Sequence, residues 1–162
     1  MRTDLFIESA LFPAFRLLPV AMGSPAAMAI CIAIALQESG LRDRQQIGGP
    51  AHGYFQFERS GGVLGVLQHR STRAHAVQVC EELDITPTVD KVFTAIEFHD
   101  VLACAFARLL LWSLPQAMPP QDDPDAGWKS YIDAWRPGKP HPDTWRANFE
   151  TGWLAVADAT MF

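Results

Sequence analysis

One uninterrupted apolar segment constrains the fold of this chain more than any other part of its sequence. Residues 26–36 are all Ala, Met, Ile, Cys or Leu, eleven apolar positions in a row. Ser24 suits the N-cap of a helix, Pro25 its first turn and Gly40 its end. Because this helix has no polar face, the sequence predicts that it is buried on all sides. Eleven residues are too few to cross a bilayer, so we expect no integral membrane segment.

Helical spacing of apolar residues continues through most of the chain. We expect further helices over residues 4–18 with a kink or break at Pro13, and over 60–68, 72–83, 126–135 and 143–159. Residues 88–114 predict one long helix or two in sequence. Residues 41–57 predict irregular chain with a short strand at 54–57, where aromatic side chains favour extended structure. The expected class is mainly α with a minor β element, in a single domain over residues 1–162.

Composition excludes several classes of function. The chain has 13 Lys and Arg against 18 Asp and Glu, which argues against nucleic acid as a partner. Three separated cysteines, Cys31, Cys80 and Cys104, indicate neither a disulfide framework nor a metal site. The histidines also lack metal-ligand spacing, so we expect no metal and no cofactor. Asp4 and Glu8 lie where a signal peptide is basic, which predicts synthesis in the cytoplasm without a signal peptide.

Glu38 stands out chemically, because it ends the apolar helix beside a glycine-rich loop. Burial disfavours a charged carboxylate, and the negative end of a helix dipole repels it, so both effects predict a raised pKa. A carboxyl group that stays protonated near neutral pH can donate its proton to a leaving oxygen, as the general acid of a glycosidase does. Taken alone, a solvated Glu38 at the end of the helix is the simpler interpretation.

Two short motifs favour the catalytic interpretation. Gln37-Glu38-Ser39-Gly40, followed across a loop by Gly53-Tyr54-Phe55-Gln56, resembles the sequence marks of the lytic transglycosylases and goose-type lysozymes. The resemblance covers about residues 25–57 and implies a lysozyme-like α+β fold. It implies that Glu38 is the catalytic acid and that Ser39 steadies the sugar or the acid. It also implies that the second motif binds the glycan, through Gly53, Tyr54, Phe55 and Gln56.

The sequence also departs from the pattern of that family. After Gln56 the chain continues Phe57-Glu58-Arg59, where the family has a turn with Pro or Thr, and the later Tyr-Asn-Gly motif is not recognisable. Tyr131 is the better substitute for the missing tyrosine, since Tyr54 belongs to the second motif. Residues 105–112 and 135–140 also resemble small phage and prophage proteins that degrade cell walls. That resemblance implies action at the bacterial wall, with a holin or the virion as the route there.

A second carboxylate would decide the mechanism. A hydrolase needs one as base or nucleophile, whereas in the lytic transglycosylases one Glu acts as acid and then as base, and groups of the substrate complete the reaction. Asp43 and Glu58 are the candidates nearest to the loop. Asp43 lies between two arginines, which favours a solvated loop charge, and Glu58 is equally suited to begin the next helix. The sequence leaves both mechanisms open.

All five tryptophans lie after residue 111. Trp112 falls within an apolar helix, which predicts a core position. Trp128, Tyr131 and Trp135 recur at spacings of three and four, so they share one helix face. We expect one of these aromatics at the wall of a cleft and the others in the core, with Tyr131 and Trp135 as the substrate-binding candidates. Residues 136–139, Arg-Pro-Gly-Lys, predict a rigid turn whose two cations suit the carboxylates of peptidoglycan.

Two functions from different classes follow. The first is a glycosidase that cleaves the β-1,4 bond between N-acetylmuramic acid and N-acetylglucosamine in peptidoglycan glycan strands, as a lytic transglycosylase or a muramidase in phage lysis or wall penetration. The second is a catalytically inactive, lysozyme-like protein of virion structure or assembly. A chitinase-like hydrolase is a lesser enzymatic alternative. Glu38 together with Gln56 favours the first function.

Overall fold

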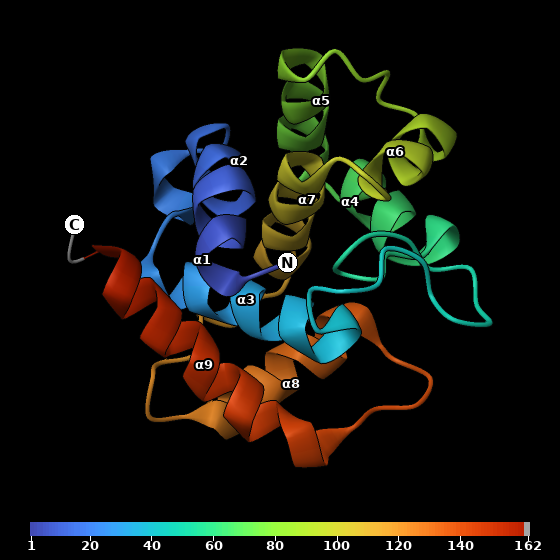
Figure 1. The fold of residues 1–162 in the computed structure, drawn as a ribbon. Helices are drawn as coiled ribbons and strands as arrows, with labels where there is room; N and C mark the ends of the chain where they lie inside the picture. The colour runs from blue at the N-terminus through green and yellow to red at the C-terminus, as the bar shows by residue number, and fades with distance from the viewer. Residues whose placement is uncertain (161–162) are drawn as a thin grey trace.

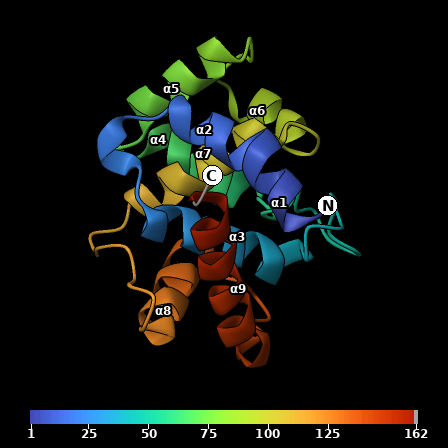
Figure 2. The ribbon, with the colours of Figure 1, turned by 60° about the vertical axis from the view of Figure 1, so that its left-hand side comes forward.

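The computed structural model describes residues 1–160 and is mainly helical, as the apolar spacing predicts. In chain order the helices are α1 (Thr3–Phe6), α2 (Phe12–Arg16), α3 (Pro25–Ser39), α4 (Leu64–Gln68), α5 (Arg73–Glu82), α6 (Val89–Ile96), α7 (Asp100–Trp112), α8 (Pro124–Trp135) and α9 (Pro142–Thr160). Two π-helical turns, η1 (Ile7–Leu11) and η3 (Arg59–Val63), precede α2 and α4, and η2 (Val20–Met22) is a 3-10 turn. Figures 1 and 2 show α8 and α9 on one side of α3, with α4, α5 and α6 on the other.

Helix α3 begins and ends where its sequence predicts. The Ser24 Oγ accepts a hydrogen bond from Ala27 N (3.0 Å), and Gly40 ends the helix in the left-handed conformation, at a φ of 60°. Residues 29–35 are all fully buried. The predicted burial of this helix on all sides is therefore confirmed. Within residues 1–160, no helix is long and apolar enough to cross a membrane.

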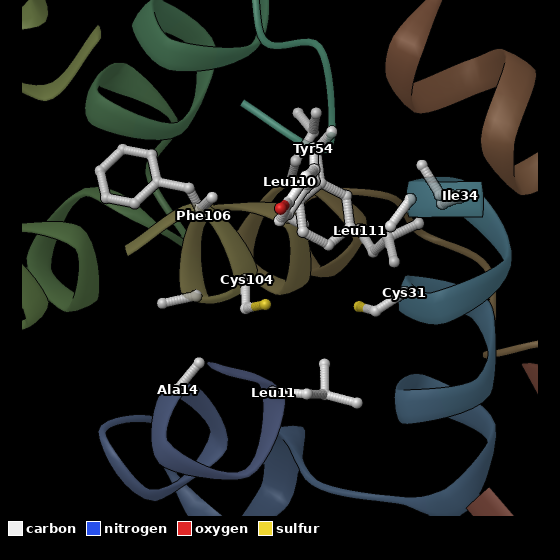
Figure 3. Packing of buried hydrophobic residues seen from close by; sticks show 14 of the residues in the cluster. Leu11, Ala14, Cys31, Ile34, Tyr54, Cys104, Phe106, Leu110 and Leu111 are labelled. Carbon is white, nitrogen blue, oxygen red and sulfur yellow. The ribbon is translucent and has the colours of Figure 1, made fainter. Parts of the chain in front are cut away.

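Two further helices account for much of this burial. Helix α9 crosses α3 so closely that a Cβ at Gly152 would lie 2.3 Å from the Ala29 carbonyl oxygen. Helix α7 lies on the other side, and its residues 102–111 are all buried. Figure 3 shows Cys31 of α3 and Cys104 of α7 pointing toward each other across this core. Both side chains are unpaired thiols, and burial raises their pKa values, so they behave as small apolar groups.

The structure decides between the alternatives that the sequence left open in two helical segments. The chain stays helical through Pro13 without a break, and the π-helical turn η1 comes directly before α2. Because proline has no N–H and its ring crowds the carbonyl four residues earlier, a wider turn accommodates it. Residues 88–114 form two helices, one of the two predicted arrangements, and His99 begins the second, its Nδ1 accepting a hydrogen bond from Leu102 N (3.3 Å).

The predicted strand at residues 54–57 is wrong. These residues lie in a tight turn, which is closed by two hydrogen bonds of 2.9 Å between the backbones of His52 and Phe57. Across residues 1–160, β structure is limited to the isolated bridges Gln45–His52 and His52–Phe57. Tyr54, Phe55 and Phe57 have aromatic side chains that favour extended structure, but all three are buried in the core. Packing against distant segments therefore overrides their local preference for a strand.

The predicted core position of Trp112 is also wrong. This residue ends α7 and keeps 37% of its surface exposed. The Arg108 guanidinium lies over its ring, 5.1 Å from the ring centroid, and the Arg108 Nε donates to Met22 O (2.7 Å). A buried cation therefore lies beside the last turn of α7 and against the Trp112 ring.

Substitution of Gly152 by Ala tests the close contact between α3 and α9. The added Cβ would overlap Ala29 O and lie 3.3 Å from Ala33 N, so the two helix backbones would have to separate. We expect the free energy of unfolding to fall by about 1–3 kcal/mol, measured by chemical denaturation. Gly65→Ala is the control, since nothing lies within 4 Å of its Cβ. Equal stability of the two variants would contradict the close contact.

Candidate active site

A cleft of about 660 Å³ opens beside the C-terminal end of α3. Three segments that are far apart in the sequence form most of its walls: the end of α3, the chain between α3 and α4, and the end of α8 with the turn that follows it. Leu110 of α7 also lines the cleft. Figure 1 shows the second and third segments projecting from the same side of the molecule. Glu38, Gln56, Glu58, Tyr131 and Trp135 all line the cleft, so the structure brings these predicted site residues together.

Glu38 lies in the last turn of α3 and carries a perturbed carboxyl group. The Tyr131 hydroxyl donates a hydrogen bond to Glu38 Oε1 (2.6 Å). Burial raises the pKa of Glu38 to about 7, and the nearby charge of Glu58 adds to the rise, whereas the hydrogen bond from Tyr131 lowers it. Near neutral pH this carboxyl group is therefore protonated in a large fraction of molecules.

Aromatic packing between α8 and α9 positions Tyr131. Its ring stacks on Trp145, with centroids 5.3 Å apart and planes at 9°, and lies 5.4 Å from the ring of Trp128. Burial raises the pKa of the Tyr131 phenol, and the charge of Glu38 raises it further. The hydroxyl therefore stays protonated at ordinary pH and acts as a donor to Glu38.

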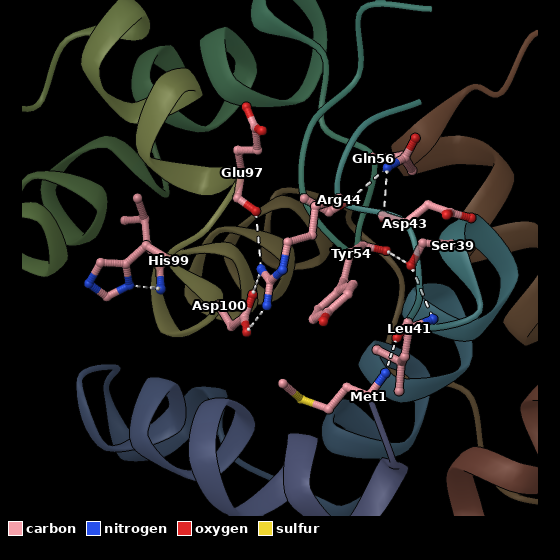
Figure 4. Close-up of polar contacts among 12 residues, drawn as sticks. Met1, Ser39, Leu41, Asp43, Arg44, Tyr54, Gln56, Glu97, His99 and Asp100 are labelled. Carbon is pink, nitrogen blue, oxygen red and sulfur yellow. Dashed lines mark hydrogen bonds and ion pairs between the residues drawn. The ribbon is translucent and has the colours of Figure 1, made fainter. Parts of the chain in front are cut away.

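Ser39 ties the end of α3 to the turn that contains the second motif. Its Oγ donates to Tyr54 O (2.7 Å) and accepts from Leu41 N (3.2 Å), as Figure 4 shows. Ser39 therefore fixes the helix end that carries Glu38 and does not contact the cleft.

The turn at residues 53–56 presents Gln56 to the cleft, while Gly53, Tyr54 and Phe55 are buried and do not line it. Gly53 has a φ of 75°, and a Cβ there would lie 2.6 Å from Ile96 O, so the position requires glycine. The Gln56 Nε2 donates to Gly53 O (2.8 Å) and thereby closes the turn. Of the four residues in the second motif, Gln56 is thus the one placed to contact a ligand with its side chain.

Sequence reasoning missed Arg44, which packs against Tyr54 in the turn of the second motif and pairs with Asp100 at the start of α7. The Arg44 guanidinium lies over the Tyr54 ring, 4.3 Å from its centroid. It also donates to both carboxylate oxygens of Asp100 (2.5 and 2.8 Å) and to Glu97 O (3.1 Å), as Figure 4 shows. Bidentate pairs of this kind fix orientation as well as position. Asp100 lies 56 residues away in the chain, and no local signal indicates that pairing.

The structure separates the two candidates for a second carboxylate. Glu58 lines the cleft, and its side chain makes no capping hydrogen bond to the π-helical turn that follows it. The Asp43 side chain is exposed and does not line the cleft. Asp43 instead contributes its backbone carbonyl, which accepts from Gln56 Nε2 (3.4 Å). Glu58 is therefore the carboxylate that shares the cleft with Glu38.

Trp135 closes the cleft between α8 and the turn of the second motif. Its Nε1 donates to Phe55 O (2.8 Å), and its ring packs against Phe57 with centroids 5.8 Å apart. Trp128 does not line the cleft and packs against Trp145 instead. Two aromatics of the stripe, Tyr131 and Trp135, therefore line the cleft where the sequence predicts only one, and Trp128 is a packing residue.

Several lining residues had no signal in the sequence that marked them as part of a site. They come from the loop at residues 46–51, where Ile47 is 90% exposed, and from the turn after α8, where His141 lines the cleft beside Lys139, whose charge the sequence did single out. The glycines and prolines of both segments indicate turns, but only the packing of α8 against α9 and α7 places these turns opposite each other.

Two substitutions should move the Glu38 pKa in opposite directions. Tyr131→Phe removes the donor that stabilises the carboxylate, so we expect the pKa of Glu38 to rise above about 7. Glu58→Gln removes a neighbouring negative charge, so we expect it to fall. Both values can be read by NMR titration of the Glu38 carboxyl carbon. Shifts in the same direction would contradict the arrangement of these three groups.

No group of three or more His, Cys, Asp and Glu side chains in the described part of the chain is arranged to hold a metal ion. Comparison of the chain with protein-family models, with curated proteins and with solved structures finds no match.

Proposed function

We propose that the chain is a peptidoglycan-degrading glycosidase with a lysozyme-like fold, which cleaves the β-1,4 bond between N-acetylmuramic acid and N-acetylglucosamine. The observation that carries the proposal is the Glu38 carboxyl group, whose pKa burial raises to about 7 in a cleft where Tyr131 orients it. A buried helix that ends in this acid, the Gln56 turn beside it and the motif resemblance support the same conclusion.

Glu38 acts as the general acid. At pH 7 an ordinary glutamic acid is protonated in well under ~1% of molecules, whereas a group with a pKa of about 7 is protonated in about half. Tyr131 occupies Oε1, and Oε2 is the oxygen left to carry the proton. Donation of this proton to the glycosidic oxygen lets the bond break without expulsion of an alkoxide, and the sugar develops oxocarbenium character.

The second half of the reaction has two routes. In the transglycosylase route the Glu38 carboxylate takes back a proton from the sugar's own 6-hydroxyl, which attacks the anomeric carbon and leaves an anhydro end. In the hydrolase route a water attacks, and Glu58 is the carboxylate in the cleft that would serve as its base. The product distinguishes the routes, because the hydrolysed end is heavier by one water. The enzyme would act at the cell wall in phage lysis or wall penetration.

Glu38→Gln tests the proposal directly. The amide keeps the size of the side chain but cannot donate the proton, so we expect clearing of a purified peptidoglycan suspension to fall by about 10²–10⁴-fold. Glu150→Gln, an exposed change on α9, should clear at the wild-type rate. Circular dichroism checks that both variants fold, and mass spectrometry of the released fragments identifies their ends. A wild-type protein that clears no peptidoglycan would instead support an inactive virion protein.

The pH dependence of cleavage should report the Glu38 pKa. The acid must be protonated at the start of the reaction, so kcat/KM should fall above about pH 7, about tenfold per pH unit. An ordinary glutamic acid would place the same decline near its usual value of 4.5. Initial rates on soluble glycan strands, measured between about pH 4 and 9, locate the pH at which kcat/KM begins to fall. A decline centred near 4.5 would rule out Glu38 as a buried general acid.

A further inference from the structure

Residues 136–141 form a strap between α8 and α9 that borders the cleft and is fixed at both ends. At one end the Trp135 Nε1 donates to Phe55 O (2.8 Å). At the other end the Gln37 Nε2 donates to His141 O (2.8 Å). Two prolines inside the strap restrict its backbone further. The strap is therefore held against the end of α3 and against the turn of the second motif.

Lys139 lies in this strap and lines the cleft. Among residues 1–160 its ammonium has no ion pair and no hydrogen-bond partner. Lys129 and Arg44, in contrast, are paired with Asp133 (2.6 Å) and Asp100, whereas the exposed Lys91 resembles Lys139 in having no ion pair among the described residues. Arg136, the second cation of the strap, does not line the cleft. Lys139 is thus an unpaired positive charge at the rim of the cleft, on a backbone that cannot easily move away.

The other ionisable groups that line the cleft are Glu38, Glu58, Tyr131 and His141. Burial, Tyr131 and Glu58 account for the state of Glu38, so Lys139 is not the counter-ion of the acid. A cation at the rim of a binding cleft gains most from an anionic group on the ligand, because the partly excluded water screens that pair less than it would at an open surface. A glycan with a carboxylate meets this requirement, and a neutral glycan does not.

We propose that Lys139 is a specificity-determining residue that selects glycans bearing a carboxylate over neutral glycans of the same backbone. This inference rests on the proposed function, since it concerns the substrate of the same cleft. In peptidoglycan the carboxylate belongs either to the lactyl ether of N-acetylmuramic acid or to the peptide attached to it.

Three polymers with one backbone test the inference: soluble peptidoglycan with its peptides, strands freed of peptide by an amidase, and the same freed strands after carbodiimide coupling to ammonia. Lys139→Met should raise KM about threefold to tenfold with kcat unchanged on whichever charged polymer supplies the carboxylate. It should leave KM on the amidated strands unchanged, and Lys139→Arg should restore most of the loss. Lys91→Met, an exposed change on α6, is the matched control and should alter nothing.

The peptide-bearing polymer and the freed strands identify the source of the carboxylate, since the lactyl carboxylate is free only after the peptide is removed. Equal KM values for Lys139→Met and Lys91→Met on both charged polymers would overturn the inference and leave the proposed function intact. If the wild type cleaves nothing, binding of the three polymers by the wild type and by Lys139→Met decides separately. Weaker binding of the charged polymers alone supports the inference, and unchanged binding overturns it.

Discussion

The burial of α3 on all sides is the constraint on which the rest of the structure depends. A helix without a polar face needs apolar neighbours around its whole circumference. Helix α9 supplies one of them through the close approach at Gly152, and α7 supplies another. Because the apolar segment is enclosed up to residue 35, its last turn is where the core meets the cleft, and Glu38 lies in that turn.

The same burial raises the pKa of Glu38 and lowers the free energy of unfolding at neutral pH. The folded protein binds the Glu38 proton more tightly than the unfolded chain does, because the pKa rises from 4.5 to about 7 on folding. Between pH 4.5 and about pH 7 the free energy of unfolding therefore decreases as pH rises, because the unfolded chain loses this proton first. Above about pH 7 the folded protein contains a partly buried carboxylate. Tyr131 offsets part of that cost with its hydrogen bond, while Glu58 increases it. Such a balance is typical of sites that keep an acid reactive at the expense of stability.

The cleft is held in shape by hydrogen bonds between segments that are far apart in the sequence. Trp135 reaches Phe55, Gln37 reaches His141, and Arg44 reaches Asp100. Local patterns predicted most of the helices well, since each depends on spacing and caps within a few residues. They failed for residues 54–57 and for Trp112, because burial against distant segments decides the conformation of the first and the exposure of the second.

The sequence by itself determined that a helix with eleven consecutive apolar residues runs from Pro25 to a glycine stop and places an acid in its last turn, because the capping residues and the apolar run are local properties. It also singled out Gln56, Tyr131 and Trp135. Only the tertiary structure decided that these residues share one cleft, that Glu58 rather than Asp43 faces it, and that Lys139 stands unpaired at its rim. The physical reason is that those relations depend on how α8 packs against α9 and α7 and on how the second-motif turn is tied to the end of α3, and these contacts join residues up to 104 positions apart.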